Sequence, residues 1–86
     1  MYKIEYLESV VQKDLSTLSK MAKIQIRRAI EERFTKAPVE FGKPLQYSLK
    51  GCCRLRIGDY RVIYQIDEKT HTVIIVKIGN RKDVYS

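Results

Sequence analysis

The stretch CRLRIGDYRVIY, residues 53–64, decides the fold, because two β-strand patterns flank a two-residue turn. Glycine at the first turn position suits a type II′ hairpin, which needs a positive φ there. A two-residue loop also fixes the register of the strands it joins. The expected cross-strand pairs are Ile57 with Tyr60, Arg56 with Arg61, Leu55 with Val62 and Arg54 with Ile63.

Side-chain alternation separates this hairpin into an apolar and a basic face. The apolar face holds Cys53, Leu55, Ile57, Tyr60, Val62 and Tyr64. The other face holds Arg54, Arg56 and Arg61, which we call the arginine face. Like charges directly opposite each other destabilise a strand pair by roughly 0.2–1 kcal/mol, so folding alone would not select Arg56 opposite Arg61. A phosphate ligand would, because guanidinium donors match phosphate oxygens. The alternative is a solvated face whose arginines pair with acids elsewhere.

The rest of the chain predicts one α+β domain over residues 1–86. A strand is expected over 2–7, followed by an amphipathic helical stretch over 9–36 that breaks near 17–20, where serine can cap a second helix. Pro38 ends that helix, and a loop over 37–44 leads to strands near 46–49, 53–57, 60–67 and 72–78. We therefore expect a strand and a two-helix hairpin packed on one face of a three- to four-stranded antiparallel sheet.

Net charge, cysteine content and apolar runs limit the classes of function that this sequence fits. The 86 residues carry a formal charge of +7, of which +5 lies in residues 42–86, so an anionic partner is favoured. Cys52 and Cys53 are adjacent and point to opposite faces of a strand, so no disulfide is expected. A single histidine and this cysteine pair do not make a zinc site, and no cofactor is expected. The unpaired cysteines favour a reducing compartment, no apolar run could cross a membrane, and the N-terminus has no signal-peptide pattern, which together predict a cytoplasmic protein.

The C-terminal residues add further candidates to the arginine face. Gly79 and Asn80 predict a turn that could carry Arg81 and Tyr85 across the sheet. Tyr85 could stack on a base, although packing at a chain end is the more common role of such a residue. No histidine or carboxylate is clearly placed for acid-base work, so a hydrolase built here would have to act through charge.

Residues 54–64, RLRIGDYRVIY, and 79–85, GNRKDVY, together resemble the RelE branch of the RelE/ParE toxins. The resemblance implies the toxin of a type II toxin-antitoxin pair, with a RelE-like β-α-α-β-β-β fold. It also implies a ribosome-dependent mRNA endoribonuclease that cleaves in the A site. In that reaction the ribose 2′-hydroxyl attacks the adjacent phosphate without a metal. The implied partners are a RelB-like antitoxin, in a possible hetero-oligomer, and the ribosome with its mRNA.

The resemblance also assigns roles to residues of this chain. The catalytic set it implies is Arg54, Arg56, Arg61, Arg81 and Tyr85. Further RNA-binding cations would be Lys50, Lys77 and Lys82. Arg54 and Arg56 stand where the family carries lysines, and arginine is not a plausible general base. The base would then be Tyr85, Lys50, Lys82 or a ribosomal group.

Two other functions remain open from the sequence. One is a ParE-like toxin, which shares the fold but inhibits gyrase. The other is a catalytically weak basic module that binds RNA or a partner protein, an option that the replaced lysines keep open.

Overall fold

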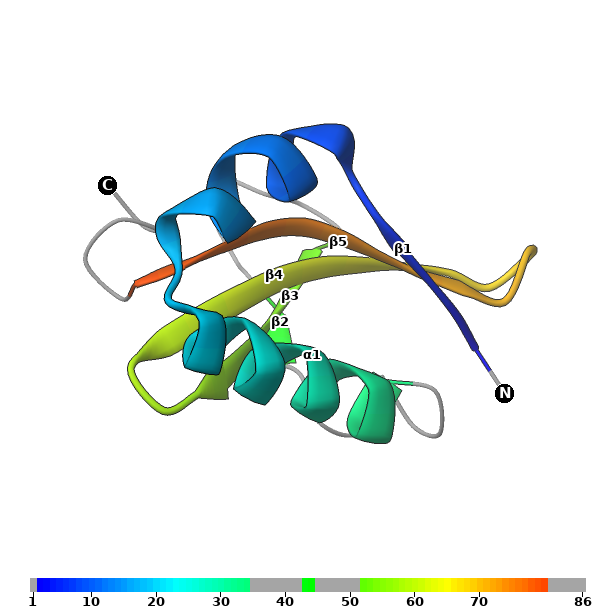
Figure 1. Cartoon of the computed structure of the whole chain (residues 1–86). Helices are drawn as coiled ribbons and strands as arrows, with labels where there is room; N and C mark the ends of the chain where they lie inside the picture. The colour runs from blue at the N-terminus through cyan, green and yellow to red at the C-terminus, as the bar shows by residue number, and fades with distance from the viewer. Residues whose placement is uncertain (1, 35–42, 45–51, 81–86) are drawn as a thin grey trace.

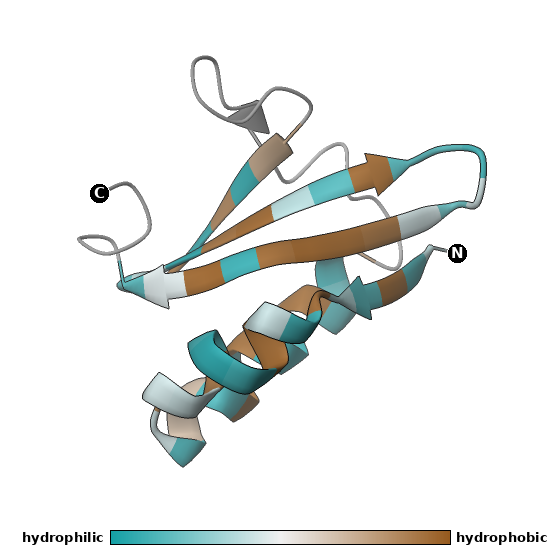
Figure 2. Cartoon of the chain, turned by 90° about the horizontal axis from the view of Figure 1, so that it is seen from above, coloured by the Kyte–Doolittle hydropathy of each residue, from teal (hydrophilic) through white to brown (hydrophobic). Residues whose placement is uncertain are grey.

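The computed structural model describes residues 2–34, 43–44 and 52–80. Their strands form one sheet in the order β1-β5-β4-β3-β2, and the helices cover one of its faces (Figures 1 and 2). The strands are β1 (Lys3–Tyr6), β2 (Lys43–Pro44), β3 (Cys52–Ile57), β4 (Tyr60–Asp67) and β5 (Thr72–Asn80). The helical segments are η1 (Val10–Asp14), η2 (Leu15–Thr17) and α1 (Lys20–Phe34). The expected α+β architecture is confirmed.

The β3–β4 hairpin has the register that its turn predicts. All four expected pairs are present, including Arg56 opposite Arg61 and Arg54 opposite Ile63. Gly58 has a φ of 58°, whereas Asp59 is not among the residues with positive φ. That combination is the one a type II′ turn requires.

The break between the two helical segments is also confirmed. Leu18 is extended, with φ −93° and ψ 147°, and α1 begins two residues later. The Ser19 hydroxyl accepts a hydrogen bond of 3.1 Å from the backbone N–H of Ala22, so Ser19 caps α1.

The first helical segment is not a regular α-helix. It is a five-residue π-helix, η1, followed by a three-residue 3-10 helix, η2. In η2 the hydroxyls of Ser16 and Thr17 donate to the carbonyls of Lys13 and Asp14. Such local bonds compete with the regular helical ladder, which explains why the amphipathic pattern does not give a second full α-helix.

β1 joins the sheet as expected but runs parallel to its neighbour. It pairs with β5 from Lys3 opposite Thr72 to Tyr6 opposite Ile75, and the N–H of Leu7 continues the pairing to the Ile75 carbonyl at 3.1 Å. β3, β4 and β5 pair antiparallel through short hairpins. The sheet is therefore mixed, because β1 reaches β5 through the helical layer and is free to take the parallel direction.

The main core lies between the helices and the apolar face of the sheet. Figure 2, in which hydrophobic residues are brown, shows the helices against one face of the sheet. Its buried members are Val10, Ile26, Ile30, Phe34, Leu55, Ile57, Val62, Tyr64, Val73, Ile75 and Ile78. Cys53 and Tyr60, also expected on this face, are partly buried against the same cluster. The Phe34 and Tyr64 rings pack with centroids 4.1 Å apart, which joins the end of α1 to the middle strand.

Both cysteines are free thiols, and their side chains lie on opposite faces of the sheet. Cys52 is buried with Ile63 and Val76 on the arginine side of the sheet, whereas Cys53 packs against the main core. Burial, followed by the neighbouring Cys52, raises the pKa of the Cys53 thiol.

The turn expected at Gly79 and Asn80 is wrong, because both residues belong to β5 and pair with Arg61 and Tyr60. The end of the loop expected over 37–44 is also a strand, since Lys43 and Pro44 form β2. The strand expected near 46–49 and the end of the helix at Pro38 lie outside the described residues. Within the described ranges, no helix has the length and apolar character needed to cross a lipid bilayer.

Removing the cap of α1 tests the helical break. Ser19→Ala should lower the free energy of unfolding by about 1 kcal/mol, because the N–H of Ala22 loses its acceptor. Urea unfolding monitored by circular dichroism measures the change. Ser16→Ala is the control, since its hydroxyl bonds only within the adjoining turn. An equal loss in both variants would contradict the capping role.

Alkaline pH should destabilise the fold. Burial raises the pKa of Tyr64 and of Tyr6, with a further rise of the Tyr6 pKa from Glu31. The folded state therefore keeps phenolic protons that the unfolded chain releases near its ordinary pKa of about 10. The free energy of unfolding should fall as pH rises above that value, and Tyr64→Phe should flatten the decline in urea titrations. A flat wild-type profile between pH 9 and 11 would contradict this account.

Candidate functional site

The arginine face lies on two adjacent strands, on the side of the sheet away from the helices. Arg54 and Arg56 project from β3 and are exposed, while Arg61 on β4 is partly buried. Neighbouring strands lie about 4.8 Å apart, so the directly opposed Arg56 and Arg61 bring their charges close together.

The turn holds the two opposed arginines on a shared acceptor. Arg56 Nε donates to the Gly58 carbonyl oxygen at 3.3 Å, and Arg61 Nη1 donates to the same oxygen at 3.4 Å. Arg61 Nη1 also lies 3.1 Å from the Tyr60 carbonyl oxygen. A guanidinium carries five N–H donors, so both groups keep most of theirs for a ligand.

No acidic side chain neutralises this charge within the described part of the chain. The ion pair found there joins Arg27 to Glu31 on α1, at 3.2 Å and in the other layer. No described carboxylate forms an ion pair with Arg54, Arg56 or Arg61. The interpretation of the arginines as partners of local acids therefore has no support in these residues.

β5 adds a fourth cation to the face. Lys77 pairs with Ile63, which in turn pairs with Arg54, so these three residues form one row across β5, β4 and β3. Lys77 is partly buried. The structure therefore brings the predicted residues Arg54, Arg56, Arg61 and Lys77 onto one surface.

A small apolar cluster that the sequence pattern does not predict lies beside these cations. Cys52 and Ile63 are buried on this side, with Val76 packed against them. The register shift between Ile63 and Tyr64 makes Val76 the extra residue of a β-bulge. A strictly alternating sequence pattern does not reveal a bulge. The nearly continuous apolar run of β5 nevertheless indicates that both faces of this strand are buried.

The sequence pattern does not predict the role of Asp14 either, and this residue anchors the end of β5. Its Oδ2 accepts a hydrogen bond of 2.9 Å from the backbone N–H of Ile78, 64 residues away in sequence. β1 pairs only as far as Ile75, so beyond that point the edge of β5 has no strand partner. The carboxylate supplies the missing acceptor and fixes the strand end that leads to residue 81.

Four predicted site residues, Lys50, Arg81, Lys82 and Tyr85, lie outside the described residues and stay predictions. Arginine is not a plausible general base in proteins. This part of the surface can therefore hold a phosphate and stabilise added negative charge, but the proton acceptor of any transfer must be another group.

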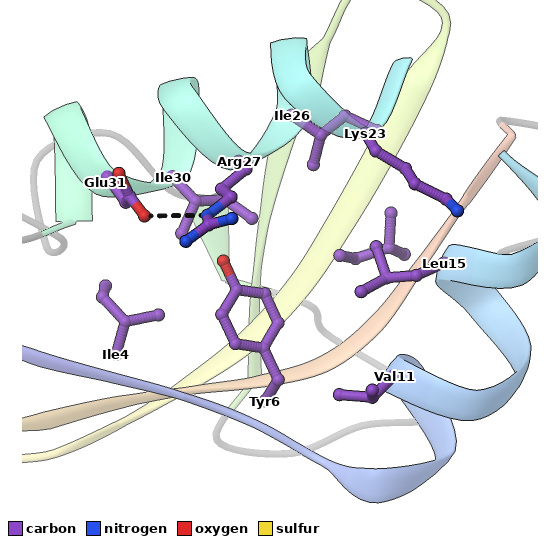
Figure 3. Close-up of a pocket in the computed structure, with 10 residues that line it drawn as sticks. Ile4, Tyr6, Val11, Leu15, Lys23, Ile26, Arg27, Ile30 and Glu31 are labelled. Carbon is purple, nitrogen blue, oxygen red and sulfur yellow. Dashed lines mark hydrogen bonds and ion pairs between the residues drawn. The ribbon is translucent and has the colours of Figure 1, made fainter. Parts of the chain in front are cut away.

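A separate cavity of about 410 Å³ lies in the helical layer (Figure 3). Most of its lining is apolar, from β1, η1, η2 and α1, and the Tyr6 hydroxyl points toward the Arg27–Glu31 ion pair. It contains none of the predicted site residues.

Comparison with known proteins gives consistent matches. The family model described as "ParE toxin of type II toxin-antitoxin system, parDE" matches residues 6–85. Toxin RelG of Mycobacterium tuberculosis is 39% identical over 51 residues, which are 59% of each chain. Toxin RelE of the same organism is 46% identical over 48 residues, 56% of this chain and 50% of that protein. The matches thus span only about half to three fifths of these relatives' lengths.

Solved structures match over a larger share of the chain. The toxin-antitoxin complex RelBE2 from M. tuberculosis aligns with a TM-score of 0.85 and 28% identity, covering 93% of this chain and 98% of that one. The intact E. coli RelBE complex aligns with a TM-score of 0.71 and 20% identity over 93% of this chain and 96% of that one. The second match shows likeness of fold alone.

We expect the arginine face to bind RNA and to add little to the stability of the folded protein. Arg61→Gln should weaken binding of a single-stranded RNA and lower the salt dependence of log K by about one phosphate contact. The free energy of unfolding should stay unchanged or rise, because a like-charge pair is removed. Fluorescence anisotropy at several salt concentrations and urea unfolding measure the two effects.

Arg28→Gln, on the exposed side of α1, is the matched control for the loss of one positive charge. If both variants lose RNA affinity equally, the arginine face has no special part in binding.

Proposed function

The chain belongs to the RelE/ParE superfamily of toxins from type II toxin-antitoxin systems, and from this premise we propose that it cleaves mRNA on the ribosome. The observation that carries the proposal is the convergence of Arg56 and Arg61 on the Gly58 carbonyl, with no acid paired to them in the described residues. Two guanidinium groups held together in this way fit a phosphate diester better than an uncharged ligand.

The proposed reaction is an internal transesterification of RNA. The ribose 2′-oxygen attacks the adjacent phosphorus, the bond from phosphorus to the 5′-oxygen breaks, and a 2′,3′-cyclic phosphate remains. The 2′-hydroxyl proton passes to a base, and the departing 5′-oxygen gains a proton. Donors already in place for the charge that develops on phosphorus lower the barrier, which is the role we give Arg54, Arg56 and Arg61.

Five further residues, outside the three arginines, complete this proposal. Arg81 would add a donor from the chain that follows the anchored end of β5, and Tyr85 would stack on a base of the substrate. Lys50, Lys77 and Lys82 would bind neighbouring phosphates. Since arginine does not act as the base, that role falls to Tyr85, Lys50, Lys82 or a ribosomal group.

We also propose an antitoxin partner and a cytoplasmic site of action. The M. tuberculosis and E. coli structures named above are toxin-antitoxin complexes. An acidic antitoxin, or one that lays a helix across the arginine face, would complement the charge of +7 and keep RNA away.

Inhibition of gyrase is the second candidate, because the matching family model bears the name of ParE. The curated relatives with the names RelG and RelE favour cleavage of RNA instead. A weak RNA-binding module is the third candidate, since arginines stand where the resemblance expects lysines.

The decisive experiment adds the purified protein to a translation reaction with a defined mRNA and maps new 5′ ends by primer extension. Cuts should follow the codon period and vanish when ribosomes are left out. Arg81→Ala should lower the cleavage rate by about 10²- to 10³-fold, because one preorganised donor is lost. Arg28→Ala should keep the wild-type rate.

Two results would contradict the proposal. One is intact mRNA together with inhibited supercoiling by gyrase, which would establish the second candidate. The other is RNA binding without new 5′ ends on ribosomes, which would establish the third. Unchanged cleavage by folded Arg81→Ala would remove that residue from the site.

A further inference from the structure

A second cavity, of about 460 Å³, lies where β5 ends, between this strand, η1 and η2. It is distinct from the apolar cavity of Figure 3, since Ile78 is the one lining residue they share. Its polar lining consists of Asp14, Thr17, Tyr60, Lys77 and Asn80. A volume in the range of ligand pockets with a few convergent polar groups is typical of a binding site.

The cavity shares β4 and β5 with the arginine face, although the helical layer also lines the cavity and the arginine side chains lie on the other side of the sheet. Gly79, which lines it, pairs with Arg61, and the pair Tyr60–Asn80 is the next one along the same strands. Lys77 belongs to both, since it lines the cavity and completes the row of Arg54 and Ile63. The Arg61 side chain lies on the other side of the sheet, so a nucleotide whose phosphate contacts Arg61 would place a neighbouring base in the cavity by passing the end of β5.

The Asp14 carboxylate is the group in this cavity that can distinguish between ligands. Oδ2 is held at 2.9 Å by the Ile78 N–H, so the side chain has a fixed orientation. Thr17 Oγ1 donates to the Asp14 backbone carbonyl at 2.8 Å, which secures the residue from the other side. Its second oxygen, Oδ1, receives no hydrogen bond from the described residues. A carboxylate placed in this way accepts hydrogen bonds and donates none.

We propose that this cavity binds a base of the RNA substrate and that Asp14 recognises its exocyclic amino group. Cytosine, adenine and guanine carry such a group and uracil does not, and carboxylates accept from cytosine N4. Tyr60, partly buried beside the cavity, provides an aromatic surface of the kind on which unpaired bases stack. Asp14 is thus a specificity-determining residue for the cleavage proposed above, and this inference depends on that function.

The test compares the binding of cytidine and uridine monophosphates to the full chain by calorimetry. The wild type should bind the cytidine nucleotide about tenfold more tightly, the value of one hydrogen bond to a charged group. Asp14→Asn should reverse this preference. The asparagine oxygen can still accept from Ile78, while its amide nitrogen turns a donor into the cavity and fits the uracil carbonyl.

Glu32→Gln is the matched control, because it removes the same charge from the exposed side of α1 and should keep the wild-type preference. A structural role of Asp14 would lower both affinities without reversing their order. Should Asp14→Asn not fold, Tyr60→Leu should weaken both nucleotides about tenfold through lost stacking. Equal binding of the two nucleotides to the wild type, or an unchanged preference in folded Asp14→Asn, would overturn the inference.

Cleavage mapping separates this inference from the proposed function. If the nucleotide preference reverses but no ribosome-dependent cuts form, base recognition by Asp14 in the cavity is supported and the cleavage proposal is wrong. If cuts form with the same base preference in wild type and Asp14→Asn, cleavage stands and the role of Asp14 is wrong.

Discussion

The two-residue turn at Gly58 and Asp59 determines what each side of the sheet contains. A positive φ of 58° at Gly58 closes the hairpin in one register, and a shift of one residue would exchange its two faces. In the observed register, the apolar side chains of β3 and β4 meet α1, which buries Ile26, Ile30 and Phe34 against them. The arginines are thereby placed together on the opposite face, where their repulsion remains in the free protein.

That repulsion connects the fold with the proposed chemistry. The Gly58 carbonyl accepts from both Arg56 and Arg61, so the turn that sets the register also orients the two cations. A second constraint acts at the end of β5, where Asp14 replaces the missing strand partner of Ile78. The helical layer therefore supports the arginine face from a distance, because it fixes the strand that carries Lys77.

Local patterns made the hairpin predictable, whereas long-range pairing did not. The turn residues give the register of β3 and β4, and a serine cap gives the start of α1, since both depend on neighbours in sequence. The parallel direction of β1 and the bulge at Val76 depend on tertiary packing that period-two alternation does not encode. The bond from Ile78 to Asp14 spans 64 residues, and an isolated aspartate in a helical segment gives no signal of such a partner.

A double-mutant cycle on Arg56 and Arg61 tests the central claim most directly. The four proteins, each arginine changed to glutamine alone and together, are compared by urea unfolding with and without a short single-stranded RNA. The account predicts that the two arginines destabilise each other by about 0.2–1 kcal/mol in the free protein and that bound RNA removes or reverses this coupling. A favourable coupling in the free protein, unaffected by RNA, would show that the pair serves the fold and would contradict the account.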